Sequence, residues 1–423
     1  MDLSVNRRRF LQVAGATALA TSSIKIPSAQ AAPTKITYWA WSEHVRGAKA
    51  VYPKFQELHP DIEVDIINLN PQEIQDKMLI ALTTGVGAPD VALIIEKRFP
   101  TYPPTGGLLD VTKSLAGLES QYEPRLWSRL HYDGKAYGVP YINNSAVMFY
   151  RRDIFEKAGL TAPIDTWPEW IEAGKKVRAM DSNVYMHQVS GGVAGNGPLD
   201  GYMESAGVQY FDENGKTIRN NKAAAEVLRF YYDLVKKHDI ALLVRHNSPE
   251  YFVAMKTGKI AALHSGNWGL ERIENEAPDL KGKWGVMPWP KWSKDAPATT
   301  GTWGGSILAI PKTGKNLDAT VKWATFLGTN VDAQVGLWQS SYGYPTNLNA
   351  QKDPRMLEEQ PYLGQSMYEA SLKPRETKYF NLIPDWPRAQ VAMGRQLDLM
   401  FKGDRTPEQA WADFEAEMVA FTG

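Results

Sequence analysis

The feature that most constrains this chain is a regular alternation of strand-like and helix-like hydrophobic patterns in its first hundred residues. Residues 36–41 alternate as a half-buried strand does, and residues 62–67 and 91–95 are further short apolar runs. Between these runs, apolar residues recur at helical spacing in 48–58 and 74–82. This order predicts parallel strands joined by right-handed crossovers. We therefore expect an α/β fold in which ligands bind beyond the carboxyl ends of the strands.

A second strand and helix layer begins in the segment from His131 to Asp153. Asp133 and Gly134 form a two-residue turn signal between short extended flanks. Residues 146–150 are a continuous apolar run of strand length, and a helix start follows at Asp153. One layer ends where the next begins, so we expect a hinge here.

Length and composition narrow the class of protein. A chain of 423 residues exceeds what one hydrophobic core usually serves, and at about 150 residues per domain we expect two domains. Lys and Arg balance Asp and Glu at 47 each, so we expect no nucleic-acid partner. The absence of cysteine excludes disulfides and thiolate chemistry. The seven histidines show no metal-binding spacing on one helix, so we expect no metal and no cofactor.

The N-terminus has the pattern of a bacterial export signal. Residues 6–12, NRRRFLQ, form a twin-arginine pattern, residues 13–24 are weakly apolar, and residues 29–31 offer a small-residue cleavage site. The apolar stretch is shorter than the ~20 residues of a membrane span. We expect residues 1–31 to be a twin-arginine signal peptide and the mature protein to lie in the periplasm. A basic tail would leave the cleavage site unexplained.

Motifs for catalysis are weak. Residues 215–217, GKT, end like a phosphate-binding loop, but Tyr210 stands where that motif needs a glycine. No Gly-x-Ser-x-Gly motif occurs. The two carboxylates of a glycoside hydrolase can come from distant segments, so the sequence leaves a hydrolase open.

Aromatic residues give the positive signal, because several stand at predicted strand ends or in irregular loops beside glycine, proline or small polar residues. These are Trp41, Trp268, Trp303, Tyr344 and Trp386. A flat indole stacks on the apolar face of a sugar ring while neighbouring polar groups bind its hydroxyls. The competing interpretation of each aromatic residue is that it only packs its own loop.

Several segments, taken in order, resemble extracellular solute-binding proteins of family 1, the sugar-binding components of ABC importers that include maltose-binding protein. No single motif is specific, but their order and spacing are, and they cover nearly the whole mature chain. The matching segments are TYWAW (37–41), FQELHPDIEV (55–64), GAPDV (87–91), GGLLD (106–110), DGKAYGVP (133–140), FYRRDIFEKAGL (149–160), GNW (266–268), WGGS (303–306) and GYPT (343–346).

The resemblance implies the two-lobed α/β fold of type II periplasmic binding proteins, which closes on its ligand like a Venus flytrap. Its three interlobe crossovers would fall near 142–147, 305–309 and 338–342. The first lobe would contain 33–142 plus 306–340, and the second 143–305 plus 341–423.

The resemblance also implies the residues that contact the ligand. They are Trp41, Glu43 and His44 after the first strand, Glu96 and Arg98 after the third, Asn143 and Asn144 at the crossover, Trp268 as a stacking platform, Trp303 with the backbone of Gly304 and Gly305, Tyr344 and Trp386. Ile94 stands where maltose-binding protein has a tryptophan, which argues against a maltodextrin ligand.

We expect a monomeric periplasmic receptor that binds a sugar or glycoside without transforming it and delivers it to a membrane permease. The sequence also leaves open an anionic sugar derivative, such as a glycerol phosphate or a sulfonated glycoside, held by His44, Arg98 and Arg375. An exported glycoside hydrolase and a structural or adhesion role are further hypotheses from different functional classes.

Overall fold

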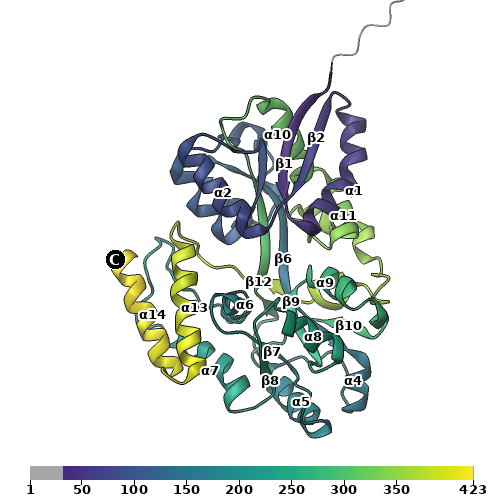
Figure 1. Ribbon diagram of the computed structural model, residues 1–423, viewed down its shortest axis with the longest axis vertical. Helices are drawn as coiled ribbons and strands as arrows, with labels where there is room; N and C mark the ends of the chain where they lie inside the picture. The colour runs from purple at the N-terminus through teal and green to yellow at the C-terminus, as the bar shows by residue number, and fades with distance from the viewer. Residues whose placement is uncertain (1–31, 423) are drawn as a thin grey trace, which may run out of the picture.

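The computed structural model describes residues 32–422, and these fold into two lobes that lie one above the other along the long axis of the molecule (Figure 1). The first lobe opens with the order of elements that the hydrophobic pattern predicts. They are β1 (Thr34–Ala40), α1 (Ser42–Leu58), β2 (Ile62–Asn68), α2 (Pro71–Thr84) and β3 (Val91–Ile95). The prediction of these elements is confirmed.

One sheet of seven strands runs through both lobes, in the order β10-β6-β12-β3-β1-β2, with β9 also paired to β6. Its other strands are β6 (Gly138–Arg151), β9 (Ala262–Gly266), β10 (Trp284–Met287) and β12 (Thr302–Ala309). β1 is parallel to β2 and β3, as predicted, because α1 and α2 cross over between them. β12 is antiparallel to both β3 and β6, so it joins the parallel strands to the rest of the sheet.

The long strand β6 belongs to both lobes (Figure 1). Its residues 138–145 pair with β12, and its residues 146–151 pair with β9 and β10. Every residue of β6 except Tyr150 is buried. Ile142 packs in the core of the first lobe, whereas Ala146 packs in the second. The strand therefore crosses between the lobes within a few residues.

The core of the first lobe lies between its sheet and two later helices, α10 (Leu317–Thr329) and α11 (Val331–Ser341). Phe55 of α1 and Trp323 of α10 are in edge contact, with ring centroids 4.9 Å apart. Both rings are completely buried. The helical spacing read from the sequence therefore marks the face of α1 that packs into this core.

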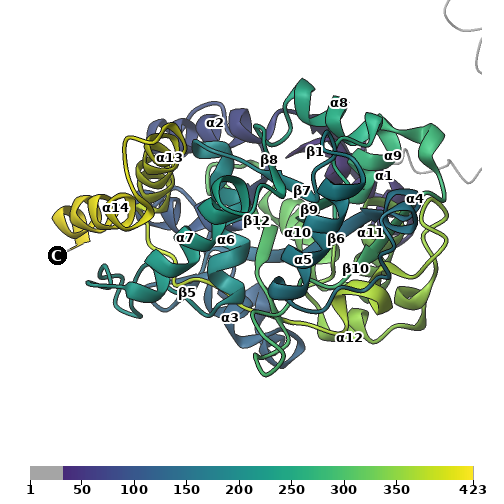
Figure 2. The same cartoon turned by 90° about the horizontal axis from the view of Figure 1, so that it is seen from below.

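The second lobe has two hydrophobic clusters. The larger is built by α5 (Trp167–Met180), α6 (Asn196–Ser205), α7 (Lys222–Lys236), α13 (Trp386–Lys402) and α14 (Pro407–Thr422). The smaller involves α8 (Pro249–Thr257) and α9 (Gly269–Glu276). Seen from below, α13 and α14 lie at one side of this lobe and α9 lies toward the other (Figure 2).

Short elements complete the structure. They are α3 (Pro124–Ser128), β4 (His131–Tyr132), β5 (Lys135–Ala136), α4 (Arg152–Lys157), β7 (His187–Val189), β8 (Ala241–Leu243), β11 (Thr299–Thr300), α12 (Leu348–Gln351) and β13 (Glu376–Thr377). The hairpin of β4 and β5 confirms the turn signal, since Asp133 and Gly134 both have positive φ. None of the helices between residues 32 and 422 is both long and apolar enough to cross a membrane.

The composition of segment 190–201, SGGVAGNGPLDG, predicts a flexible binding loop, and the structure shows that this prediction is wrong. The segment forms a 3₁₀ turn at Val193–Gly195 and then the first half of α6. Gly201 lies so close to Gly301 that a Cβ on Gly301 would come within 2.8 Å of the Gly201 Cα. The glycines therefore let a buried helix pack against the chain just before β12.

The extents of the lobes remain a proposal. At the third crossover, Trp338 and Tyr342 pack in the same cluster as Phe149. We keep 33–142 plus 306–340 and 143–305 plus 341–423 as working ranges. The expected signal peptide, residues 1–31, lies outside the described residues.

Buried histidines in the second lobe make stability depend on pH. His187 accepts a hydrogen bond from Trp170 Nε1, and Tyr202 lies between His187 and His264. Burial lowers the pKa of His187 to about 3 and the pKa of His264 well below its usual value. The unfolded chain thus takes up these protons near pH 6.5, and the folded chain does not. The stability that these neutral histidines contribute is fully present above pH 6.5, and it is lost as the pH falls toward their pKa values in the folded protein.

We expect the free energy of unfolding to fall between pH 7 and pH 4, and His187→Gln to reduce that fall by about 1–3 kcal/mol. Glutamine keeps an acceptor for Trp170 and cannot titrate. Urea unfolding followed by circular dichroism at several pH values measures this. An unchanged pH dependence in the variant would contradict the assignment.

Candidate functional site

Most of the residues that the sequence suggests as ligand contacts lie where the lobes face each other. The first lobe supplies the residues that follow β1 and β3, and β3 runs directly into the 3₁₀ helix η1 (Glu96–Thr101). The second lobe supplies Trp268, the N-cap residue of α9, and the start of β12. Both lobes therefore contribute to one region.

The group after β1 is buried and internally hydrogen-bonded. Trp41 Nε1 donates to Glu43 Oε1 at 2.8 Å, and the Trp41 and His44 rings are in edge contact at 4.7 Å. Burial lowers the pKa of His44 to about 4, so the ring is neutral at pH 7. Burial raises the pKa of Glu43, but His44 and hydrogen bonds from the backbone and from Ser42 outweigh it, and the pKa is lowered overall. His44 Nδ1 is buried without a hydrogen-bond partner among residues 32–422.

The group after β3 carries alternating charges. The carboxylate of Glu96 is buried and forms an ion pair with Arg129. Lys97 forms an ion pair with Asp200 of the second lobe. Arg98 is half-buried and has no ion pair within the part of the chain that the structure describes. Arg98 is therefore the cation of this turn that a ligand could use.

The asparagines at the crossover play different parts. Asn144 Oδ1 accepts from Asn267 Nδ2 at 3.0 Å and from Tyr344 N at 3.1 Å, so it ties three segments together. Asn143 Nδ2 donates to Tyr379 at 2.7 Å, while its Oδ1 has no partner among the described residues. Asn143 thus keeps a buried acceptor for a ligand, whereas the acceptor oxygen of Asn144 is already used by the protein.

Trp268 and the start of β12 form a compact unit. Trp268 is half-buried, and its Nε1 donates to the Trp303 carbonyl at 2.8 Å. Gly304 has a φ of 83°, and a Cβ there would approach Trp268 Nε1 to 3.2 Å. A Cβ on Gly305 would lie 3.4 Å from Glu96 Oε2 of the first lobe. The Trp268 ring, the glycine backbone and Glu96 are therefore neighbours, and glycine leaves the space between them open.

Trp303 itself points into the second lobe. It is 6% exposed, and its ring contacts His246 and His264 with centroids 5.4 and 5.2 Å apart. Its backbone rather than its ring belongs to the region between the lobes.

Two expected ligand contacts are corrected by the structure. Trp386 is 1% exposed at the start of α13 and stacks on Tyr210 with the ring planes 10° apart. Arg375 donates through Nε to the Trp289 carbonyl at 2.7 Å and forms an ion pair with Asp165 at 3.0 Å. Both side chains are committed to the interior or the flank of the second lobe. Their local sequence did not reveal these distant partners.

His246 is a residue that sequence reasoning missed. It follows β8 in a loop, and its ring lies 5.4 Å from Trp303 and 6.3 Å from Trp268. Both ring nitrogens are buried without a hydrogen-bond partner among the described residues. Burial lowers the pKa of His246 to about 4. No motif or periodicity marks it, since it is a single polar residue in a loop.

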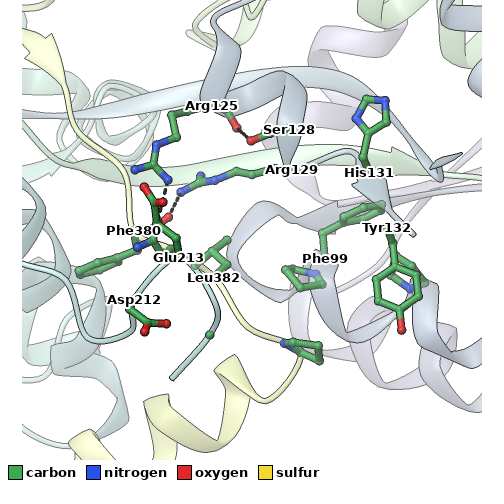
Figure 3. Close-up of a pocket in the computed structure, with 15 residues that line it drawn as sticks. Phe99, Arg125, Ser128, Arg129, His131, Tyr132, Asp212, Glu213, Phe380 and Leu382 are labelled. Atoms are coloured by element: carbon green, nitrogen blue, oxygen red, sulfur yellow. Dashed lines mark hydrogen bonds between the residues drawn. The ribbon is translucent and has the colours of Figure 1, made fainter. Parts of the chain in front are cut away.

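A cavity of about 280 Å³ also lies between the lobes (Figure 3). Phe99 and Arg129 line it from the first lobe, and Asp212, Phe380 and Leu382 line it from the second. None of the residues suggested by the sequence lines it. Arg129 donates across it to the Phe380 carbonyl at 2.9 Å, so the lobes touch at this point.

The family model of bacterial extracellular solute-binding proteins matches residues 41–334. The chain is 25% identical over 397 residues to an arabinooligosaccharide-binding protein of Halalkalibacterium halodurans, covering 89% of this chain and 87% of that one. It is 26% identical over 315 residues to a lactose-binding protein of Rhizobium radiobacter, covering 71% and 72%.

Among solved structures, the chain is similar to an ABC transporter-associated binding protein from B. animalis subsp. lactis in complex with β-1,6-galactobiose. The TM-score is 0.76 at 24% identity, covering 92% of this chain and 98% of that one. This likeness confirms the α/β fold of the periplasmic binding proteins.

The two tryptophans should respond differently to truncation. Trp386→Ala removes a fully buried ring and should lower the free energy of unfolding by about 3–5 kcal/mol. Trp268→Ala removes a half-buried ring and should cost about 1 kcal/mol or less. Urea unfolding of both variants without ligand tests this. Equal losses would mean that Trp268 is a core residue.

Proposed function

The chain belongs to the bacterial extracellular solute-binding proteins, and on that basis we propose that it binds a neutral sugar between its lobes and presents it to an ABC permease. The family binds solutes, so the chain is a binding protein rather than an enzyme. The observation that carries the proposal is the half-buried Trp268 ring beside Gly304, Gly305 and Glu96. This arrangement suits a sugar ring, because one face is aromatic and the edge is polar.

Unpaired polar atoms nearby support a polyhydroxyl ligand. His44 Nδ1, Asn143 Oδ1 and both ring nitrogens of His246 are buried without partners among residues 32–422. A buried polar atom without a partner costs about 1–3 kcal/mol, and a ligand hydroxyl that donates or accepts would remove that cost. A neutral imidazole can do either, according to its tautomer.

The three cations that the sequence suggests for an anionic ligand do not form a common anion site. An anion would need His44, Arg98 and Arg375. His44 is neutral because of burial, and Arg375 is held by Asp165. Arg46 faces Glu271 across the lobes at 3.5 Å, so it too has a counter-charge. Of the three cations that an anion would need, only Arg98 stays available.

The names of similar proteins suggest which class of sugar this chain binds. The names of two of them specify arabinooligosaccharide and lactose, and we propose a di- or oligosaccharide or glycoside for this chain. Export through the twin-arginine route, a monomeric state and the permease partner remain proposals that rest on the sequence and the family.

A thermal-shift screen of residues 32–423 tests the proposal. We expect arabinotriose, lactose or another neutral sugar to raise the melting temperature, since a ligand that binds only the folded state at 100 times its Kd adds about 2.7 kcal/mol. Glycerol 3-phosphate and a sulfonated glycoside serve as anionic probes.

The Trp268→Ala variant should lose most of that shift while its melting temperature without sugar stays nearly unchanged. A shift with anionic probes alone would contradict the neutral ligand and direct attention to Arg98. No shift with any sugar would contradict sugar binding.

A further inference from the structure

We propose that Lys97 is a positioning residue that holds the lobes closed by inserting its ammonium group between Asp200 and Glu204 of the opposite lobe. The inference rests on the proposed function, because Glu96 and Arg98, on either side of Lys97, are proposed ligand contacts. We call Asp200 and Glu204 the carboxylate pair.

The contact joins the two lobes directly. Lys97 Nζ lies 2.9 Å from Asp200 Oδ2 and 3.4 Å from Glu204 Oε2. The side chains are 10%, 4% and 0% exposed, respectively, so water reaches little of this contact. Asp200 and Glu204 are one turn apart on α6 and share one face of that helix.

The carboxylate pair is built by the second lobe alone. Glu204 Oε2 accepts from the backbone and the hydroxyl of Thr302, each at 2.7 Å, and its Oε1 accepts from Phe380 N at 3.1 Å. The Tyr210 hydroxyl donates to Asp200 at 3.4 Å. These bonds do not involve the first lobe. Lys97 is thus the group that moves, and the carboxylate pair is a fixed receptor for it.

The charges make this contact specific to the closed state. In the closed form one ammonium faces two buried carboxylates, with the Phe380 ring 4.8 Å from the nitrogen. Without Lys97 the closed form would bury two carboxylates with no ammonium between them, and Asp200 would keep only the hydrogen bond from Tyr210 among the described residues. When the lobes are apart, water can solvate the Lys97 ammonium and Asp200. Removing the lysine therefore raises the free energy of the open form much less than that of the closed form.

The same contact stabilises the turn that carries two of the proposed ligand contacts. Lys97 lies in one 3₁₀ turn with Glu96 and Arg98, so seating its ammonium fixes that turn against the second lobe. Arg129, the ion-pair partner of Glu96, donates to the carbonyl of Phe380, whose N–H binds Glu204. The register of β3 and β12, in which Ile95 faces Ser306, already places Glu96 beside Gly305. Closure adds the contacts that hold this turn against the second lobe.

The absence of cysteine from the chain allows a direct test of closure. Spin labels on cysteines introduced at the exposed positions Ile80 of α2 and Ala412 of α14 report the distance between the lobes by pulsed electron paramagnetic resonance. Lys97→Met keeps the aliphatic stem and removes the charge. Lys35→Met is the matched control, since Lys35 pairs with Glu63 at 3.0 Å within the first lobe.

Without any sugar, we expect Lys97→Met to lower the ratio of closed to open molecules at least about fivefold, and Lys35→Met to leave it unchanged. Asp200→Asn should lower it less, and adding Lys97→Met to that variant should have a smaller effect than in the parent protein. Melting temperatures measured in parallel separate closure from stability.

An unchanged distance distribution in Lys97→Met would overturn the proposal, whether or not the melting temperature falls. An equal shift in the control, a parent protein with no closed population, or full additivity with Asp200→Asn would also overturn it. The experiment contains no sugar, so a failed sugar screen and a failed closure test remain separate results.

Discussion

Backbone hydrogen bonding along β6 is the constraint on which the rest of the structure depends. Nearly all of this strand is buried, and its buried N–H and C=O groups need partners. Its first half finds them in β12 and its second half in β9 and β10. One continuous strand thus holds two separate cores together, and the residues proposed to contact a ligand gather where it passes from one core to the other. This strand therefore ties the two lobes to each other.

Local patterns predicted the scaffold because each element carries its own signal. The periodicity of residues 36–95 and the turn at Asp133 and Gly134 depend on neighbours in the chain, and the structure confirms both. The prediction of a flexible loop at residues 190–201 was wrong for a physical reason. A glycine-rich composition favours flexible chain, but Gly201 is there because helix α6 packs tightly against Gly301. Sequence alone does not distinguish a glycine that makes the backbone flexible from one that lets two backbone segments pack closely.

The candidate site was harder to predict because its residues are selected by distant partners. Trp268 and Trp386 have the same local signal, an indole beside glycine or proline, yet one is half-buried between the lobes and the other stacks on Tyr210. Arg375 finds Asp165 across 210 positions of the chain. The resemblance to a family supplied the order of the segments and hence the fold. The partners of the charged residues and the burial of the histidines came only from the structure.

Gly304 has a consequence for how such a protein can diversify. Its left-handed backbone and its closeness to Trp268 both exclude a side chain, and it stands in β12, one of the strands that cross between the lobes. Under the proposed function, side chains such as Trp41 or His44 could change to suit another sugar, because they lie outside β12. The spacing between the indole platform and the crossing backbone has no such freedom. Under the proposed function, gene duplicates would therefore inherit one fixed slot for a flat ring and vary only the polar groups around it.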